Sequence, residues 1–249
     1  MKAFSLNNHA ALVTGSSQGI GLAMGRALQE AGARVVFHGL QASVEGLASY
    51  VQADLMQNDG PQRLVDAAFS IEPGIDTLIC NAGSFFDLPL LEMTRERWDK
   101  TMQLNLASAF FTVQAFARRL VDAKRGGCIV ITSSTNGFQA EMDSCAYDAS
   151  KGALVMLTKS LAVSLADHGI RVNGIAPGLI KTPLTAAWME SRDRSLIEHY
   201  ERKVLLRRVG APPDVTGAAV FLCSDAAGYI TGETIVIDGG LTCCQIGRM

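Results

Sequence analysis

Tyr147 and Lys151 stand four residues apart in the stretch CAYDASKGALVML, which covers residues 145–157. If this stretch is helical, both side chains project from one face of the helix. A phenol ordinarily loses its proton near pH ~10, and a fixed cation beside it favours the phenolate. The pair therefore predicts a tyrosine that exchanges a proton with a ligand. The spacing alone also fits an exposed tyrosine beside a solvated lysine.

A glycine-rich turn, TGSSQGIG, occupies residues 14–21, between an apolar run and a helical pattern. Glycines let a backbone approach a pyrophosphate closely, and the amino terminus of a helix offers N–H donors and a positive dipole end. The spacing is GxxxGxG rather than the GxGxxG of many dinucleotide sites. A carboxylate, Asp54, closes the third apolar run. Together these features indicate a dinucleotide site, although any tight strand-to-helix turn can use glycine.

The composition indicates a globular, slightly acidic chain. Of its 249 residues, 48% are hydrophobic and 18% are charged, which supplies a large core and argues against long disorder. The net charge of −2 offers no basic excess for a phosphate backbone, so we expect no nucleic acid partner. The opening stretch MKAFSLNNHAALVTG has no apolar signal-peptide core, and we expect neither a signal peptide nor a membrane span.

The six cysteines and four histidines form no recognisable metal site. No CxxC pair occurs, and no His/Cys cluster has the spacing of zinc ligands. We therefore expect reduced thiols, a cytoplasmic location and no metal. Cys145, two residues before Tyr147, fits a small pocket-wall residue better than a nucleophile.

Apolar runs alternate with helical patterns along the chain, without a linker or an internal repeat. The predicted strands are Ala10–Thr14, Arg34–His38, Tyr50–Ala53, Thr77–Cys80, Cys128–Ser133, Arg171–Ile175 and Thr234–Ile237. The predicted helices are Gly19–Ala31, Gly60–Ile71, Arg95–Ala123, Tyr147–Asp167 and Pro213–Leu222. Most strands are continuously apolar, as strands buried on both faces are. The alternation predicts an α/β fold: one Rossmann-like domain over residues 1–249, with a doubly wound, mostly parallel seven-stranded sheet and helices on both faces.

Two segments depart from this alternation. The stretch GLQASVEGLASY, between the second and third strands, leaves room for little more than two turns of helix. Residues 181–206 carry no strand pattern and follow the sixth strand. Because ligands bind beyond the carboxyl ends of parallel strands, we expect residues 181–206 to form a substrate lid.

Seven motifs, in order along residues 11–240, resemble those of the short-chain dehydrogenase/reductase family. They are TGSSQGIG at 14–21 (family TGxxxGIG), Cys80-Asn81-Ala82-Gly83 (family NNAG), Asn105, Ser134 thirteen residues before Tyr147, the YxxxK pair Tyr147 and Lys151, Pro177-Gly178, and ITGETIVIDGG at 230–240. This succession identifies the chain as a member of that family and favours the proton-exchanging tyrosine over the exposed one. Cys80 replaces the family's first Asn, for which we expect a modest effect on stability.

The resemblance implies a nicotinamide-dependent alcohol dehydrogenase or carbonyl reductase. It assigns catalysis to Asn105, Ser134, Tyr147 and Lys151. Tyr147 is expected to act as base toward an alcohol and as acid toward a ketone. Lys151 is expected to lower the pKa of the phenol and to bind the nicotinamide ribose. Ser134 is expected to align the substrate oxygen, and Asn105 to kink its helix and hold a water near Lys151.

The resemblance also implies where the cofactor binds. The expected contacts are Gly15, Ser17, Gln18, Ile20, Gly21, Gly39, Leu40, Asp54, Leu55, Asn81, Ala82, Gly83, Tyr147, Lys151, Pro177, Gly178, Ile180 and Thr182. Gly39 occupies the family's usual acid position, and residues 35–44 contain no Lys or Arg to pair with a 2′-phosphate. We therefore expect NAD to be preferred over NADP, although no acid excludes NADP.

The substrate is the least defined part of the prediction. The expected contacts are Phe85, Asn136, Glu141, Cys145 and Trp188, with Ser84, Phe86, Gln139, Leu179 and Met189 as further pocket candidates. Their mixture of polar and aromatic groups favours a secondary alcohol or ketone on a small hydroxylated compound, such as a sugar or polyol. One alternative is a 3-oxoacyl-[acyl-carrier-protein] reductase whose Arg118, Arg119, Lys124 and Arg125 dock an acidic carrier protein. A non-catalytic scaffold on the same fold is a second alternative, which the four catalytic residues disfavour.

Two helical stretches predict self-association. Residues 106–121 and 153–166 are apolar on more than one face, whereas a helix that covers a sheet needs one apolar face. We expect these surplus faces to pack between subunits of a homo-oligomer, most simply a tetramer.

Overall fold

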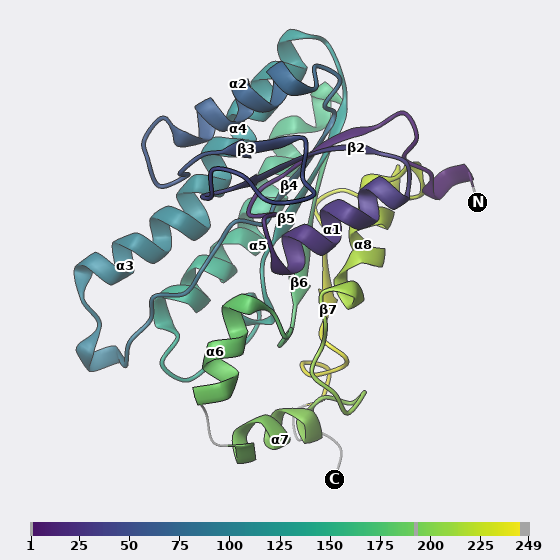
Figure 1. The fold of residues 1–249 in the computed structure, drawn as a ribbon. Coiled ribbons are helices and arrows are strands. Elements are labelled where there is room, and N and C mark those ends of the chain that lie inside the picture. The colour runs from purple at the N-terminus through teal and green to yellow at the C-terminus, as the bar shows by residue number, and fades with distance from the viewer. Residues whose placement is uncertain (1, 192–193, 245–249) are drawn as a thin grey trace.

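The computed structural model describes residues 2–191 and 194–244, and its centre is one seven-stranded sheet (Figure 1). The strands are β1 (Ala10–Val13), β2 (Arg34–Gly39), β3 (Tyr50–Gln52), β4 (Thr77–Cys80), β5 (Gly127–Thr132), β6 (Ile170–Pro177) and β7 (Thr234–Ile237). Their order is β3-β2-β1-β4-β5-β6-β7, and every neighbouring pair is parallel. The predicted doubly wound fold is confirmed, with a sheet that is parallel throughout these seven strands.

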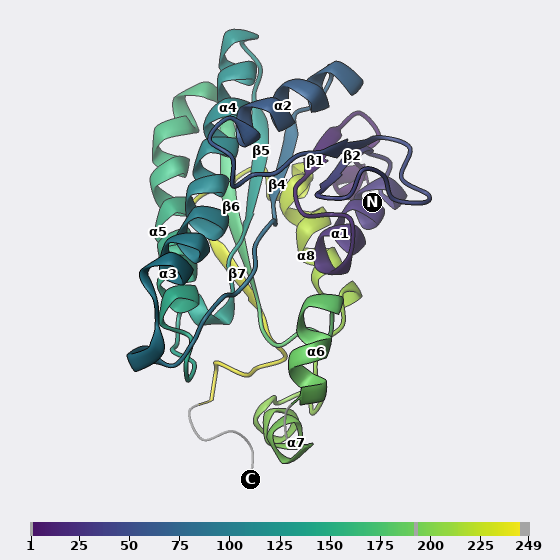
Figure 2. The same cartoon turned by 60° about the vertical axis from the view of Figure 1, so that its left-hand side comes forward.

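Helices cover both faces of the sheet, as Figure 2 shows. On one face lie α2 (Gly60–Ile71), α4 (Ser108–Asp122) and α5 (Cys145–Leu165). On the other lie α1 (Gly19–Glu30) and α8 (Pro213–Cys223). Each layer has its own apolar core against the sheet.

The strand β1 illustrates why the strands read as unbroken apolar runs. Successive side chains of a strand point to opposite faces of the sheet. Ala10 and Leu12 pack into the core with α2, α4 and α5, whereas Ala11 and Val13 pack into the core with α1 and α8. All four are buried, because both faces of the sheet are covered.

The helix predicted over Arg95–Ala123 is not regular. It consists of α3 (Arg95–Met102), a π-helical segment (Gln103–Ala107) and α4. π-helical turns inside helices commonly mark functional positions. Here the wider turn carries Asn105, so the predicted irregularity at this residue is confirmed.

The two unusual segments have different structures. Residues 41–49 form turns and bends rather than the short helix for which the sequence left room. Residues 181–206 form two helices, α6 (Pro183–Ser191) and α7 (Arg194–Lys203), which lie beyond the carboxyl edge of the sheet (Figure 1). Among the described residues, no helix has the length and apolar character that a membrane span requires.

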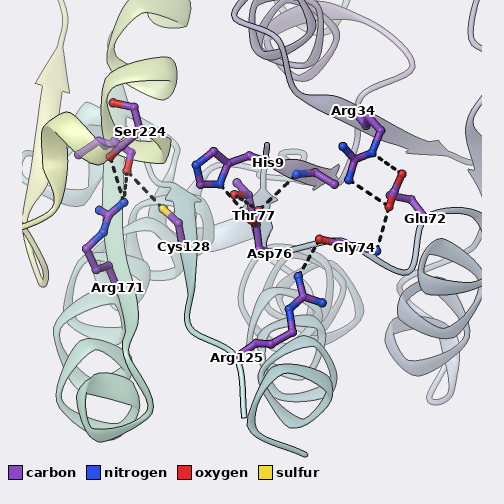
Figure 3. A network of polar contacts seen from close by, with 12 residues as sticks. His9, Arg34, Glu72, Gly74, Asp76, Thr77, Arg125, Cys128, Arg171 and Ser224 are labelled. Carbon is purple, nitrogen blue, oxygen red and sulfur yellow. Dashed lines mark hydrogen bonds and ion pairs between the residues drawn. The ribbon is translucent and has the colours of Figure 1, made fainter. Parts of the chain in front are cut away.

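Figure 3 shows polar contacts among residues at the amino edge of the sheet. Asp76 accepts hydrogen bonds from the Ala10 N–H (3.3 Å) and the Thr77 hydroxyl (2.9 Å), and it lies 3.0 Å from His9 Nδ1. Arg125 donates to the Gly74 carbonyl at 2.7 Å. These contacts occupy backbone and side-chain groups at the starts of β1 and β4, so this edge serves the fold.

One close contact between α1 and the sheet gives a stability test. A Cβ atom at Gly25 would lie 3.0 Å from Phe37 Cζ and closer still to Cε1, and the Phe37 ring is fully buried. We predict that Gly25→Ala lowers the free energy of unfolding by about 1–3 kcal/mol, because the helix must move off the sheet. Gly217→Ala is the matched control. Nothing lies within 4 Å of its added Cβ, so it should stabilise α8 by up to about 1 kcal/mol. Equal effects of the two substitutions in urea unfolding would contradict this packing.

Candidate active site

The loops that follow β1 and β4 are clasped together at the carboxyl edge of the sheet. The Thr14 hydroxyl oxygen accepts hydrogen bonds from the backbone N–H groups of Asn81 (2.9 Å) and Ala82 (3.0 Å). In return, Asn81 Nδ2 donates to the carbonyl oxygens of Thr14 (3.2 Å) and Gly15 (3.0 Å). The backbones approach so closely that a Cβ at Gly15 would lie 2.7 Å from Ala82 Cα. The family-like TG and NAG motifs therefore form one structural unit.

The glycine turn provides a cradle that fits a pyrophosphate. Gly15 and Gly19 both have φ +59°, a backbone conformation that other residues rarely adopt. A Cβ at Gly21 would lie 2.5 Å from Asn81 Nδ2, so only glycine fits the first turn of α1. The N-cap residue Gln18 makes no side-chain capping bond, which leaves the first N–H groups of this 12-residue helix available to an anion.

The buried ring of His38 is hydrogen-bonded to the glycine turn. Its Nδ1 accepts the Gly15 N–H at 3.0 Å, so its Nε2 must carry the proton and donate to the Ala53 carbonyl at 3.1 Å. The ring is buried, and this burial lowers the pKa of His38 to about 4. Neutral His38 thus ties β1, β2 and the end of β3 together.

The expected adenine end of the site is only partly as predicted. Asp54 accepts hydrogen bonds from Gln57 Nε2 (3.0 Å) and Met56 N–H (2.9 Å), which lower its pKa. Leu40 is exposed. Leu55, however, is buried in the core under α2, so its side chain is directed away from a ligand and only its backbone is available. The sequence could not show this, because the chain turns into the core immediately after Asp54.

The segment after β6 crosses to the glycine turn. β6 ends at Pro177, and a Cβ at Gly178 would lie 2.8 Å from Asp238 Cβ, beyond the end of β7. Thr182 lies beside Gly19, with its Cβ 3.5 Å from the position of an added Cβ there. Ile180 is buried in the core with α1 and α8. The expected cofactor contacts from both ends of the sequence are therefore brought to one edge.

The catalytic candidates lie on three adjacent elements. Tyr147 and Lys151 are in the first two turns of α5, and Lys151 Nζ lies 5.3 Å from the centre of the Tyr147 ring. Lys151 Nζ donates to the Thr132 carbonyl at the end of β5, at 3.1 Å. Ser134, just beyond β5, shares a hydrogen bond with the Tyr147 hydroxyl. Tyr147 and Lys151 thus lie near each other on α5, as their four-residue spacing predicts.

Burial drives both ionisable groups toward their neutral forms. It raises the pKa of Tyr147 to about 12, an effect that the Ser134 hydrogen bond opposes and that the charges of Asp148 and Asp87 reinforce. Burial also lowers the pKa of Lys151 to about 8. The phenol pKa therefore shifts in the direction opposite to the lowering expected from Lys151, because desolvation disfavours the phenolate.

Asn105 links the π-helical turn to the catalytic helix. Its Nδ2 donates to Ser150 Oγ (3.0 Å) and to the Ser84 carbonyl (2.9 Å), and its Oδ1 accepts the Ser84 N–H (2.9 Å). Ser150 Oγ in turn donates to the Tyr147 carbonyl at 2.7 Å. Asn105 thus supports the loop after β4 and α5 simultaneously.

Two residues that were expected to bind substrate hydroxyls use their polar groups within the chain. Asn136 donates to Asp148 Oδ1 at 2.7 Å, and its Oδ1 accepts from Ser134 Oγ at 3.3 Å. Glu141 accepts from the Tyr200 hydroxyl on α7, and its N–H donates to Asp148 Oδ2 at 2.9 Å. Their contacts therefore support an organising role around Ser134.

The other expected substrate contacts are Phe85, Cys145 and Trp188. Phe85 packs edge-on against Tyr147, with ring centres 6.3 Å apart. Cys145 is exposed at the start of α5. The side chain of Trp188 lies outside the described part of the structure. Phe85 thus lies directly beside Tyr147, as Asn136 lies beside Ser134.

Sequence reasoning missed two acidic residues at the site, Asp87 and Asp148. Asp148 organises the loop after β5, as described above. Asp87 Oδ1 accepts hydrogen bonds from the N–H groups of Ala146 (2.9 Å) and Tyr147 (3.2 Å). A carboxylate four residues beyond the NAG motif gives no sign in sequence of capping a helix 59 residues away, whereas Asp148 could have been noticed for its place beside Tyr147.

Comparisons with known proteins agree with this geometry. The family model described as Enoyl-(Acyl carrier protein) reductase matches residues 15–242. The chain is 39% identical to dehydrogenase/reductase SDR family member 4 of Oryctolagus cuniculus over 94% of both chains. It is 38% identical to an L-rhamnose 1-dehydrogenase (NAD(P)(+)) of Azotobacter vinelandii, over 92% of this chain and 95% of that one. The structure of a gluconate 5-dehydrogenase from Burkholderia cenocepacia, in complex with NADP and tartrate, superposes with a TM-score of 0.90 at 32% identity, over 98% of both chains.

His38 gives the site a pH-dependent stability. The unfolded histidine titrates near pH 6.5, whereas in the fold its pKa is about 4. As pH falls from 6.5 to 4, only the unfolded state binds the proton, so stability is lost across this window and no further below it. We predict that wild type loses about 2 kcal/mol more than His38→Gln between pH 7 and pH 5 in urea unfolding. Parallel pH dependences of the two proteins would contradict the buried, neutral histidine.

Proposed function

Because the chain belongs to the short-chain dehydrogenase/reductase family and is an NAD(P)-dependent oxidoreductase, we propose that it interconverts a secondary alcohol and a ketone at the site formed by Ser134, Tyr147 and Lys151. One observation carries this proposal: a phenol, a serine hydroxyl and a buried ammonium meet at the edge where the glycine cradle lies. This arrangement supports proton transfer at the phenolic oxygen beside a dinucleotide.

The residues divide the chemistry among them. A bound nicotinamide cofactor supplies the hydride acceptor or donor. Ser134 aligns the reacting oxygen, and Tyr147 Oη takes the proton from an alcohol or returns it to a ketone. Lys151, fixed by the Thr132 carbonyl, stabilises the phenolate that forms in the oxidative direction. Asn105 holds the backbone of this helix turn through Ser150.

The cofactor contacts are part of the same proposal. Gly15, Ser17, Gln18, Ile20 and Gly21 would hold the pyrophosphate end. Asp54, Leu40 and the backbone of Leu55 would hold the adenosine end, with Asn81, Ala82 and Gly83 at the ribose. Pro177, Gly178, Ile180 and Thr182 would surround the nicotinamide.

For the substrate we propose a small hydroxylated compound, such as a sugar, a sugar acid or a polyol. The similarity to proteins named for L-rhamnose and gluconate supports this class. The description of the matching family model names an acyl-carrier-protein reductase, which supports the alternative of an acyl-carrier-protein substrate.

The basic residues that were expected to dock a carrier protein do not favour that alternative. Arg119 forms an ion pair with Asp66 at 2.5 Å, and Arg125 donates to the carbonyls of Pro73 and Gly74 just before β4. Figure 3 places Arg125 at the amino edge of the sheet. Tyr147 lies at the opposite, carboxyl edge. A carrier protein docked on Arg125 would therefore present its acyl chain at the edge of the sheet away from Tyr147.

We propose NAD as the preferred cofactor. Space for an added side chain at Gly39 is filled by neutral groups: an added Cβ would lie 2.5 Å from Tyr50 Oη, 2.8 Å from Gln41 Oε1 and 2.9 Å from Ser17 Cβ. His38 is buried and neutral, so it offers no cation. The nearest candidate cation along α1, Arg26, donates to the Gly46 carbonyl at 2.7 Å. A 2′-hydroxyl suits these neutral groups better than a phosphate dianion does.

The segment at residues 181–206 is proposed as a substrate lid. Its first residues lie against the glycine turn at Gly19, and Tyr200 on α7 contacts Glu141 in the loop after β5. The segment therefore bridges the cofactor side and the Ser134 side of the site. Such bridging is the arrangement that a closing element needs.

We also propose a homo-oligomer, most simply a tetramer. Phe110 and Phe111 on α4, and Met156 and Val163 on α5, expose 36%, 49%, 61% and 82% of their surfaces. A surface hollow of about 570 Å³ includes Phe110, Phe111 and Leu157 in its lining, together with groups of α3 and the π-helical segment. Clustered apolar side chains of this kind mark subunit contacts. Light scattering at micromolar concentration should give a multiple of the 26.5 kDa chain mass, and a monomer mass would exclude this assembly.

Tyr147→Phe tests the proton-transfer role. We predict a loss of about 10²–10⁴-fold in kcat/KM for oxidation of the compounds identified in a screen of sugars, polyols and hydroxy acids. Binding of the reduced cofactor, measured by fluorescence, should stay close to wild type. Tyr229→Phe removes the hydroxyl of a fully exposed tyrosine and should leave both quantities unchanged. Activity of Tyr147→Phe within about tenfold of wild type would remove the phenol from the mechanism.

Cofactor preference is tested by the ratio of kcat/KM for NAD and NADP with one substrate. We predict a ratio of about ten in favour of NAD, equivalent to about 1.4 kcal/mol. A ratio in favour of NADP would contradict the neutral pocket at Gly39. In that case Arg26→Gln would show whether Arg26 leaves the Gly46 carbonyl to pair with the phosphate.

A further inference from the structure

The amino terminus of the catalytic helix is capped from another part of the chain. Ser144, the residue before α5, makes no side-chain capping bond. Asp87, in the loop after β4, supplies the missing acceptor to Ala146 and Tyr147. An acidic group at this position is favoured by the positive end of the helix dipole and by the unsatisfied N–H groups.

Only one oxygen of this carboxylate is used. Asp87 Oδ2 is buried and has no hydrogen-bond partner among the described residues. A buried carboxylate oxygen without a partner is costly, and neither helix capping nor loop structure requires it. A neutral amide or hydroxyl would accept the same two N–H groups, so the cap alone does not explain why this residue carries a charge.

The charge lies next to the group whose ionisation the reaction needs. The charged groups that face Tyr147 are Lys151 and Asp148 on α5 and Asp87 from the loop after β4, while Ser134 and Phe85 are neutral. Asp148 has both oxygens engaged, by Asn136 and by the Glu141 N–H. Asp87 is therefore the facing carboxylate with an uncompensated oxygen.

We propose that Asp87 is a positioning residue that fixes the first turn of α5 through its bonds to Ala146 and Tyr147, and whose negative charge sets the pH at which Tyr147 can accept a proton from substrate. This inference rests on the proposed function of Tyr147. The charge opposes formation of the phenolate and thus reserves alcohol oxidation for more alkaline pH, in agreement with the direction of its effect on the pKa of Tyr147. In the reductive direction it keeps the phenol protonated as an acid.

The test compares neutral replacements that keep an acceptor with one that removes it. Asp87→Asn retains an oxygen for the two N–H groups, and Asp87→Ser is a second neutral variant should the amide fit poorly. For alcohol oxidation, kcat/KM should rise with pH as Tyr147 loses its proton. In the neutral variants we expect the midpoint of this rise to move to lower pH by about half a unit. At a fixed pH below the midpoint, kcat/KM should then be about threefold higher than in wild type. Asp59→Asn, the same change at the exposed amino terminus of α2, should leave the profile in place.

Hydrogen exchange supplies a readout that needs no turnover. The amides of Ala146 and Tyr147 should exchange slowly in wild type and in Asp87→Asn, and at least about tenfold faster in Asp87→Ala. Unchanged exchange in Asp87→Ala would overturn the positioning role. A lower rate or melting temperature of Asp87→Asn with an unmoved pH profile, or a profile moved to higher pH, would overturn the role of the charge.

The outcomes also separate this inference from the proposed function. Tyr147→Phe, measured in the same series, should stay about 10²-fold or more below wild type at every pH. If it remains active, Tyr147 is not the proton-transfer residue and the proposed function fails. If it is inactive while the Asp87 variants keep the wild-type pH profile, only the inference about Asp87 fails.

Discussion

The hydrogen bonds exchanged by Thr14 and Asn81 are the contact on which the rest of the site depends. They bring the glycine turn after β1 and the loop after β4 to the van der Waals limit of backbone approach, which only Gly15 allows. From there the loop after β4 reaches the catalytic helix twice, through Ser84 to Asn105 and Ser150, and through Asp87 to the first turn of α5. A displacement of the Thr14–Asn81 contact would therefore move both the glycine turn and Tyr147.

Desolvation shifts the pKa values of three groups around the Thr14–Asn81 contact toward their neutral forms. Desolvation lowers the pKa of His38 and Lys151 and raises that of Tyr147. For His38 the neutral form is structural, because Nδ1 must accept the Gly15 N–H. For Tyr147 the neutral phenol is the form that a raised pKa favours, and neighbouring charges such as Asp87 then matter more than they would in water.

The sequence predicted the parallel sheet because the sheet depends on a local pattern, apolar runs buried on two faces. Motifs with fixed spacing also led to the four catalytic candidates, whose roles stay a prediction. Tertiary contacts, which leave no such pattern, decide the surroundings of other residues. Leu55 was assigned to adenine, but its side chain turns into the core. Asn136 and Glu141 were assigned to substrate, yet Asp148 and Tyr200 engage their polar groups. Asp87 was missed because a cap supplied from 59 residues away has no sequence signature.

We propose that this edge of the sheet supports hydride transfer between a nicotinamide and a carbinol carbon while Tyr147 moves the proton. The most direct measurement uses a reduced cofactor that carries deuterium at C4 and a panel of keto sugars and keto acids, with mass spectrometry of the products. We expect wild type to place one deuterium on the new carbinol carbon of at least one product, and Tyr147→Phe to bind the cofactor without transferring the label. Cofactor binding without label transfer by wild type to any member of the panel, or equal transfer by Tyr147→Phe, would contradict it.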